Sequence, residues 1–283
     1  MLNLIEETLL SKQLMQPWDK PIYEIMISTE QILTIQVLLP NNVLYHVRMI
    51  QVGTNEKEYE NYRLAQKTYP QFVPPLLAHE VRLPWEIIVI RGVHHRVVTA
   101  DRIPSFHPFL TENIIAFFVT GSDCAIRMPS VSHRQFLRQL RNRISDSICL
   151  AILDEWIGNA QIDTLPHIPQ HCDFIAANFG EIATGLVIFD WEDFGAVNLP
   201  GFDLCILLAS SLKFALCELM DGLSPTVGGY GGLIEESCAA LGLTPQLFRQ
   251  LIPLYLVIFL DLKKNYSNTI YEITRNAIHT LYI

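Results

Sequence analysis

The spacing of apolar residues changes near residue 105, and this change divides the chain into a strand-rich part and a helix-rich part. Before that point, apolar residues cluster in the short runs YEIMI, ILTIQVLL and VLYHVRMIQV, with turn residues at 40–42. Short runs rich in β-branched and aromatic residues predict strands. Two further runs, at 76–79 and 86–90, complete an expected antiparallel sheet, so the first part of the chain is expected to be a small β-sheet lobe.

Helical spacing dominates the rest of the chain and appears once earlier, over residues 55–69, where three prolines end an amphipathic pattern. A short amphipathic helix is also expected at the N-terminus. Beyond residue 105, apolar residues four positions apart, at 136, 140, 144, 148 and 152, predict one long helix. Further helices are predicted over 109–118, 202–220, 233–241, 245–261 and 266–282.

Composition and charge limit the classes of partner. The 283 residues are enough for two lobes with separate cores, and 50% of them are hydrophobic, which is typical of a compact globular protein. The net charge of −9 disfavours nucleic acid and anionic membrane surfaces as partners, because both are bound through Lys and Arg patches. A small-molecule partner, neutral or cationic, fits better, and the chain is expected to be a monomer or a homodimer.

Cysteine usage and apolar segments predict a cytoplasmic protein. The six cysteines are scattered without a C-x-x-C pair, as expected for free thiols in a reducing compartment. The N-terminal segment has no basic region before its apolar residues and therefore does not resemble a secretory signal. The apolar run 251–260 is roughly half the length needed to cross a bilayer, so a buried helix is expected there.

The stretch from His171 to Glu192, HCDFIAANFGEIATGLVIFDWE, contains the candidate chemistry. Asp173 is followed five positions later by Asn178, and twelve positions after that Asp190 ends an apolar run. Phosphoryl transfer needs a carboxylate that orients the attacking hydroxyl and accepts its proton, and oxygen ligands for the magnesium on the phosphates. Asp173 suits the first task, and Asn178 with Asp190 the second. The alternative is a β-hairpin whose acidic ends have no catalytic role.

This stretch and the residues after it resemble the C-terminal signature of the aminoglycoside phosphotransferase and choline kinase-like family. That signature reads HGDxxxxN, then a β-hairpin, IDWE and a D-L pair that opens a helix. The matching residues are His171, Asp173, Asn178, Asp190, Trp191, Glu192, Asp203 and Leu204.

The resemblance covers about residues 20–283 and implies an α+β fold of the bilobal protein-kinase-like type. An N-lobe, residues 1–92, would hold a small antiparallel sheet and one brace helix. A larger, mainly helical C-lobe, residues 93–283, would hold the catalytic loop and the substrate-binding helices, with the active site between the lobes. ATP and Mg²⁺ are the implied cofactors.

For the nucleotide phosphates, the resemblance points to Arg48, which stands where the family has a lysine. Its implied partner on the following helix is Glu58, with Glu60 as the second choice. An arginine keeps the charge but presents a planar fork in place of a point charge. The connector containing Arg91 and Val93 is also expected to lie at the nucleotide.

Supporting roles fall to three other residues of the signature. His171 is expected to hydrogen-bond the backbone and fix the loop, and Asp203 to open the following helix. Two alternatives remain for Glu192: its side chain either faces the substrate or is exposed to solvent. Cys172 replaces the family's glycine, and packing is its expected role if the backbone there is not left-handed.

The activity implied by the resemblance is transfer of the ATP γ-phosphate to a hydroxyl of a small metabolite or antibiotic, and cationic or amino-bearing acceptors are included. The alternative is a kinase-fold nucleotide-binding or regulatory protein with impaired turnover. It is supported by Arg48, by Cys172 and by the absence of glycine between Tyr23 and Leu39, where a phosphate-binding loop is expected. Nucleotidyl transfer is a third possibility.

Overall fold

The computed structural model describes residues 1–54, 57–99, 108–124, 131–214, 230–264 and 268–282. The chain forms two compact units. The first comprises Met1–Arg96 and Gly180–Glu192, and the second comprises Val97–Phe179 and Asp193–Ile283. The first unit therefore contains a later hairpin in addition to the N-terminal part of the chain, while a lobe boundary at residues 92 and 93 stays a prediction.

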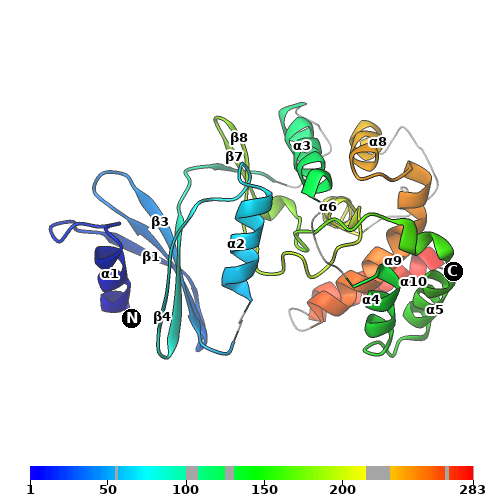
Figure 1. Cartoon of the computed structure of the whole chain (residues 1–283), viewed down its shortest axis with the longest axis horizontal. Helices are drawn as coiled ribbons and strands as arrows, with labels where there is room; N and C mark the ends of the chain where they lie inside the picture. Colours follow the sequence, from blue (N-terminus) through cyan, green and yellow to red (C-terminus); the bar gives the residue numbers. More distant parts are fainter. Residues whose placement is uncertain (55–56, 100–107, 125–130, 215–229, 265–267, 283) are drawn as a thin grey trace. The chain divides into compact units, whose positions relative to one another are not determined.

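The first unit is built on a five-stranded antiparallel sheet with the strand order β1-β2-β3-β5-β4 (Figure 1). Its strands lie where the apolar runs predicted them, which confirms the expected small sheet. They are β1 (Ile22–Ser28), β2 (Ile32–Leu38), β3 (Leu44–Gln51), β4 (Leu76–Arg82) and β5 (Trp85–Arg91).

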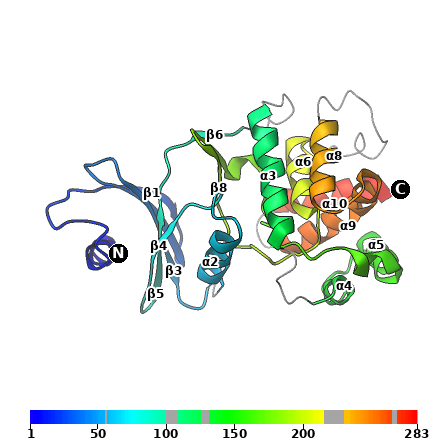
Figure 2. The same ribbon diagram turned by 45° about the horizontal axis from the view of Figure 1, so that its top comes forward.

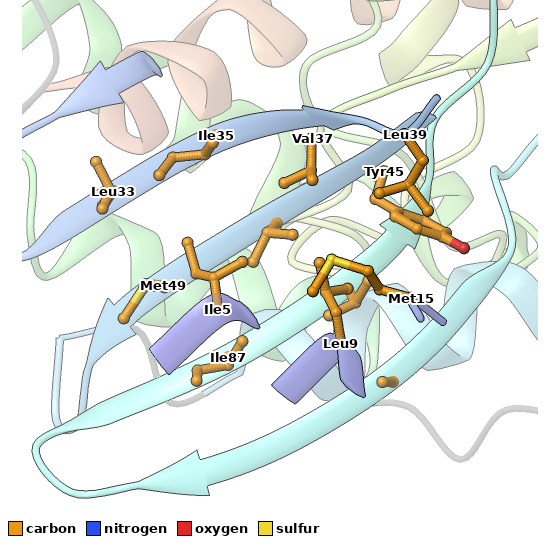
Figure 3. Close-up of a cluster of buried hydrophobic side chains, with 13 residues drawn as sticks. Ile5, Leu9, Met15, Leu33, Ile35, Val37, Leu39, Tyr45, Met49 and Ile87 are labelled. Atoms are coloured by element: carbon orange, nitrogen blue, oxygen red, sulfur yellow. The ribbon is translucent and has the colours of Figure 1, made fainter. Parts of the chain in front are cut away.

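Two helices lie on opposite faces of this sheet, α1 (Leu2–Ser11) and α2 (Glu58–Thr68) (Figures 1 and 2). On the α1 side, Ile5 and Leu9 pack into a buried apolar cluster with alternate residues of β2, β3 and β5 (Figure 3). Successive side chains of a strand point to opposite faces. Because Val47 and Met49 of β3 belong to that cluster, Arg48 between them faces the α2 side.

A second, three-stranded sheet has the order β6-β7-β8 and contains the hairpin that precedes Asp190. Its strands are β6 (Arg96–Val97), β7 (Phe179–Ile182) and β8 (Gly185–Ile188). Every residue of β8 is buried, and the Ile188 N–H donates a hydrogen bond to the Phe72 carbonyl at 2.8 Å. The predicted hairpin is therefore present, and Asp190 follows its last strand by two residues.

The second unit is mainly helical. Its described α-helices are α3 (Pro108–Cys124), α4 (His133–Arg141), α5 (Ser147–Gly158), α6 (Phe202–Ser211), α8 (Tyr230–Ala240), α9 (Pro245–Lys263) and α10 (Asn268–Tyr282). The helix predicted over 202–220 is present as α6 to Ser211, and its last six residues lie outside the described ranges.

Helix α9 forms the centre of this unit and packs against α5, α6, α8 and α10. Among the described residues it is the one helix long and apolar enough to cross a bilayer, with a mean hydropathy of 1.2. However, 61% of that apolar window is buried inside the protein. The predicted buried helix is confirmed, because its apolar surface is covered by neighbouring helices.

The single long helix predicted from the apolar stripe at 136–152 is wrong, since the structure has α4 and α5 there. Helix α4 ends at Arg141. Helix α5 starts after Asp146, whose carboxylate accepts hydrogen bonds from the N–H groups of Ile148 and Cys149 at 3.0 and 3.1 Å. An aspartate in this position caps a new helix instead of continuing the old one.

Candidate active site

The loop that carries Asp173 is folded by its own backbone and by His171. The Asp173 N–H donates to Nδ1 of His171 at 3.2 Å, which gives His171 the backbone contact expected of it. The Asp173 carbonyl accepts from the Ile175 N–H at 2.9 Å, and the Asn178 N–H donates to the Ile175 carbonyl at 3.0 Å. A short 3-10 helix, Ala176–Asn178, then delivers Asn178.

Asn178 and Asp173 lie in direct contact. The Asn178 side-chain nitrogen donates to the Asp173 carbonyl at 2.8 Å and to the Asp173 Oδ2 at 3.1 Å. Because the amide nitrogen is used by Asp173, the amide oxygen is the Asn178 atom available to a metal ion. The Asp173 side chain is 21% exposed, so its carboxylate is accessible to a small molecule.

Asp203 holds the start of this loop from the first turn of α6. Its Oδ2 accepts from the His171 N–H at 2.6 Å, and its Oδ1 accepts from the Cys172 N–H at 2.9 Å. Its own N–H donates to Oε1 of Gln170 at 3.0 Å. Complete burial raises the pKa of Asp203 to about 7, against the opposing effect of the two N–H donors. Asp203 opens the helix as expected, and its carboxylate also closes the loop.

Cys172 adopts the left-handed backbone conformation, with a φ of 72°. A packing role for this cysteine was expected on the condition that its backbone is not left-handed, and that condition does not hold. A non-glycine residue in this conformation costs roughly 1–2 kcal/mol. The thiol is fully buried and donates to the Gln170 carbonyl at 3.4 Å. Burial raises the pKa of the Cys172 thiol well above its usual value, so the thiol packs in the core and is not reactive.

Asp190 is exposed and also left-handed, with a φ of 62°, a conformation that aspartate adopts more readily than most residues. The next residue, Trp191, is 1% exposed and anchors the chain. Its indole N–H donates to the Ile188 carbonyl at 2.7 Å, and its ring lies 5.7 Å from the ring of Tyr69. The fixed tryptophan anchors the chain directly after Asp190.

Arg48 is held by two carboxylates. Its Nε lies 2.6 Å from Oε1 of Glu58, and its terminal nitrogen lies 2.7 Å from Oε2 of Glu192. Glu60, the second choice of partner, instead pairs with Arg63. Glu192 pairs with Arg48 and is 15% exposed, so neither alternative considered for it describes its observed contact.

Burial and the charges around Arg48 shift the pKa of Glu58. Burial raises the pKa of Glu58 to about 7, opposed by Arg48 and reinforced by Glu192, Asp190 and Glu86. One partly buried arginine therefore pairs with two carboxylates on the α2 face of the sheet. Such an arrangement positions a guanidinium firmly, and leaves its charge largely compensated by protein groups.

The connector containing Arg91 and Val93 is fixed to β3 through Gly92. The Gly92 N–H donates to the Leu44 carbonyl at 2.7 Å, and a Cβ on Gly92 would lie 2.3 Å from the Leu44 side chain. Only glycine allows this approach. Arg91 is exposed, with its guanidinium 5.8 Å from the Tyr45 ring centre, and the Val93 carbonyl lies 2.8 Å from Nδ1 of His95.

Lys263, at the end of α9, is the residue of this site that sequence reasoning missed. Its Nζ lies 3.5 Å from Oδ1 of Asp173 and 3.1 Å from Oδ2 of Asp193, and its side chain is 7% exposed. Helical spacing provides the one available signal, because Lys263 follows the buried residues Phe259 and Leu260 by four and three positions. It therefore lies on the buried face of the helix, where a lysine needs an acidic partner.

A five-stranded antiparallel sheet with a helix, followed by a mainly helical part, is the kinase-like fold of small-molecule phosphotransferases. Three solved structures show the likeness over nearly the whole chain. An amicoumacin kinase has a TM-score of 0.63 at 12% identity, with coverage of 100% of this chain and 96% of its own. The aminoglycoside phosphotransferase APH(4)-Ia has a TM-score of 0.61 at 13% identity, with 99% of each chain covered.

The third is a Plasmodium vivax ethanolamine kinase, with a TM-score of 0.58 at 12% identity and coverage of 99% of this chain and 87% of its own. No family model and no curated protein sequence matches the chain. At these identities the likeness shows the fold alone. The predicted fold class is confirmed, and so is the predicted likeness to aminoglycoside phosphotransferases at the level of the fold.

Proposed function

We propose that this protein is an ATP-dependent phosphotransferase that moves the γ-phosphoryl group to a hydroxyl of a small molecule. The observation that carries the proposal is the loop from His171 to Asn178. In it, a partly exposed Asp173 contacts Asn178, and Asp203 secures the loop backbone. The kinase-like fold supports the same reaction class, because the fold matches are themselves phosphotransferases.

Asp173 orients the acceptor hydroxyl and accepts its proton as the oxygen attacks phosphorus. A carboxylate in this task needs a fixed direction and access to the substrate. The contact with Asn178 supplies the first, and the exposure of the Asp173 side chain the second. Phosphoryl transfer depends mainly on such positioning, since little covalent chemistry is left to the protein.

The Asn178 amide oxygen and the Asp190 carboxylate are our candidate magnesium ligands, because magnesium prefers oxygen ligands and takes few of them from the protein when phosphates supply the others. Bound magnesium would neutralise negative charge on the phosphates during transfer. Within the described residues, no group of three or more His, Cys, Asp or Glu side chains is arranged to hold a metal ion.

Arg48 binds the nucleotide phosphates and Glu58 keeps Arg48 in place, as their 2.6 Å ion pair supports. Arg91 and Val93 contribute to the nucleotide site from the connector after β5. The acceptor is a small neutral or amino-bearing molecule, in keeping with the net charge of −9 and with relatives that include aminoglycoside and ethanolamine kinases. We place the protein in the cytoplasm, as a monomer or a homodimer.

A second candidate function is a kinase-fold protein that binds a nucleotide or a partner without turnover. The observation that favours it is the pairing of Arg48 with both Glu58 and Glu192. Phosphates would have to compete with two carboxylates for one guanidinium. The strained Cys172, in place of glycine, adds a second departure from the family signature.

Calorimetric titration with Mg-ATP, followed by an assay of ADP release with a panel of alcohols and amino alcohols, tests the proposal. The wild type is expected to bind in roughly the micromolar to millimolar range. Asp190→Asn is expected to weaken binding and abolish turnover, because it removes a metal ligand. Asp154→Asn changes a half-exposed aspartate that pairs with Arg141, and serves as the matched control.

The outcomes separate the two functions. ADP release that depends on an acceptor and is lost in Asp190→Asn supports the phosphotransferase. Nucleotide binding without turnover on any acceptor supports the second candidate. A fully active Asp190→Asn variant overturns the assignment of Asp190 as a metal ligand.

A further inference from the structure

Lys263 carries a buried ammonium group on the apolar, buried face of α9. Twelve residues of α9 are buried, and Lys263 is the charged one among them. Moving an ammonium group out of water costs several kcal/mol unless carboxylates compensate it. The compensation comes from Asp193, at 3.1 Å, and from Asp173, at 3.5 Å. The end of α9 is therefore tied to the residue proposed as the catalytic base.

The neighbouring Lys264 shows what an ordinary lysine does at this helix end. Its side chain is 43% exposed and pairs with Asp261 one turn earlier, at 2.9 Å. Exposed pairs of this kind contribute little to stability. The two adjacent lysines thus differ in burial and in partner, so the contact of Lys263 with Asp173 does not follow from its position near the end of the helix alone.

The two oxygens of Asp173 have different partners. Oδ2 accepts the hydrogen bond from the Asn178 side chain at 3.1 Å, whereas Oδ1 faces Nζ of Lys263. A carboxylate restrained at both oxygens keeps one plane and one direction. Asp193 also pairs with the ammonium group, and its carbonyl accepts the Ala196 N–H at 3.0 Å within a tight turn. Lys263 is consequently fixed at its own end as well.

We propose that Lys263 is a positioning residue for Asp173: its ammonium group, anchored by Asp193, holds the carboxylate in the direction that phosphoryl transfer requires. The inference rests on the proposed phosphotransferase function for its effect on catalysis. The ion pairs of Lys263 are with Asp173, the residue proposed to orient the acceptor, and with Asp193. Its loss is therefore expected to affect the chemical step and to leave Mg-ATP binding unchanged.

The test compares Lys263→Met, Lys263→Arg and Lys264→Met with the wild type. Lys263→Met keeps the apolar stem and removes the charge, and is expected to lower kcat roughly 10- to 100-fold, as small displacements of a catalytic group do. The Kd for Mg-ATP is expected to stay within about twofold. Lys263→Arg restores a cation and is expected to recover most of the loss, and Lys264→Met is expected to retain wild-type kcat. Wild-type kcat in Lys263→Met overturns the proposal, and so does an equal loss in Lys264→Met.

A variant that leaves two carboxylates without their cation can lose stability, so Lys263→Met is also combined with Asp193→Asn, which removes one of the two charges. The double variant is expected to fold and still show the reduced kcat. Combined with Asp173→Asn, Lys263→Met is expected to cause no further loss, because the group that it positions is already absent. An additive loss in that combination overturns the proposal.

Hydrogen–deuterium exchange of residues 171–178 separates this inference from the proposed function. Lys263→Met is expected to speed exchange in that segment at least threefold, whereas Lys264→Met leaves it unchanged. If the wild type lacks turnover but this difference is seen, the positioning contact stands and the phosphotransferase assignment fails. If the wild type turns over and Lys263→Met matches it in kcat and exchange, the function stands and the inference fails.

Discussion

The carboxylate of Asp203 accepts a hydrogen bond from the backbone N–H of His171 at 2.6 Å, across 32 positions of sequence. The same carboxylate accepts the Cys172 N–H. Both donors are buried, and a buried N–H without an acceptor is costly. The loop that carries Asp173 therefore depends for its shape on the first turn of α6, and not on its own sequence alone.

Asp203→Ala is expected to lower the free energy of unfolding by about 3 kcal/mol, because it leaves two buried N–H groups without an acceptor. Urea unfolding of the two proteins measures the difference. Asp123→Ala, which changes an aspartate near the end of α3, is the comparison and is expected to change stability by less than about 0.5 kcal/mol. Equal stability of Asp203→Ala and the wild type would show that the loop does not need this acceptor.

Arg48→Met is expected to weaken Mg-ATP binding at least tenfold, because it removes the positive charge proposed to contact the phosphates. It is also expected to cost about 3 kcal/mol of stability, since Glu58 stays buried without its cation. Calorimetry measures the affinity for Mg-ATP, and urea unfolding measures the free energy of unfolding. Arg63→Met changes an exposed arginine that pairs with Glu60 and is expected to alter neither. Unchanged affinity in a folded Arg48→Met protein would contradict the phosphate role.

Alanine variants are usually more stable than glycine variants, and the left-handed backbone at Cys172 predicts the opposite order of stability there. Both substitutions remove the thiol, but only glycine relieves the conformation, so Cys172→Gly is expected to be more stable than Cys172→Ala by about 1 kcal/mol. At the buried Cys149, inside α5, the opposite order is expected, by a similar amount. The same order at both positions would indicate that Cys172 is not left-handed in solution.

The pKa of Asp146 predicts that the stability of the folded protein depends on pH in the acidic range. Burial by itself raises the pKa of Asp146, but hydrogen bonds from the Cys149 N–H, from Arg275 and from His279 outweigh it and hold the pKa well below its usual range. A carboxylate with a depressed pKa stabilises the folded state above its unfolded pKa of about 4, and this contribution is lost as the pH falls below that value.

Asp146→Ala is accordingly expected to lower the unfolding free energy at pH 7 by about 1 kcal/mol or more, since it also removes a helix cap. The difference from the wild type is expected to narrow at pH 3. Urea unfolding at the two pH values measures it, with Asp154→Ala on the exposed face of α5 as the comparison. A difference that grows at pH 3 would contradict the depressed pKa.

Short-range patterns accounted for most of the fold. The strands of the first unit and the buried helix α9 lie where the spacing of apolar residues predicted them, because that spacing decides which side chains can be buried together. The hairpin before Asp190 was instead expected from the resemblance to the family signature. The long helix predicted through Ile144 was wrong because a single cap, Asp146, outweighed an apolar stripe that continued across the break.

The sequence by itself determined which residues carry the candidate chemistry, since the order and spacing of Asp173, Asn178 and Asp190 can be read along the chain. Only the tertiary structure decided the partners of the charged groups. It paired Glu192 with Arg48, and it brought Lys263 to Asp173 from ninety positions away. A buried charge must find its counter-charge wherever the folded chain provides one, and no local pattern records that distance.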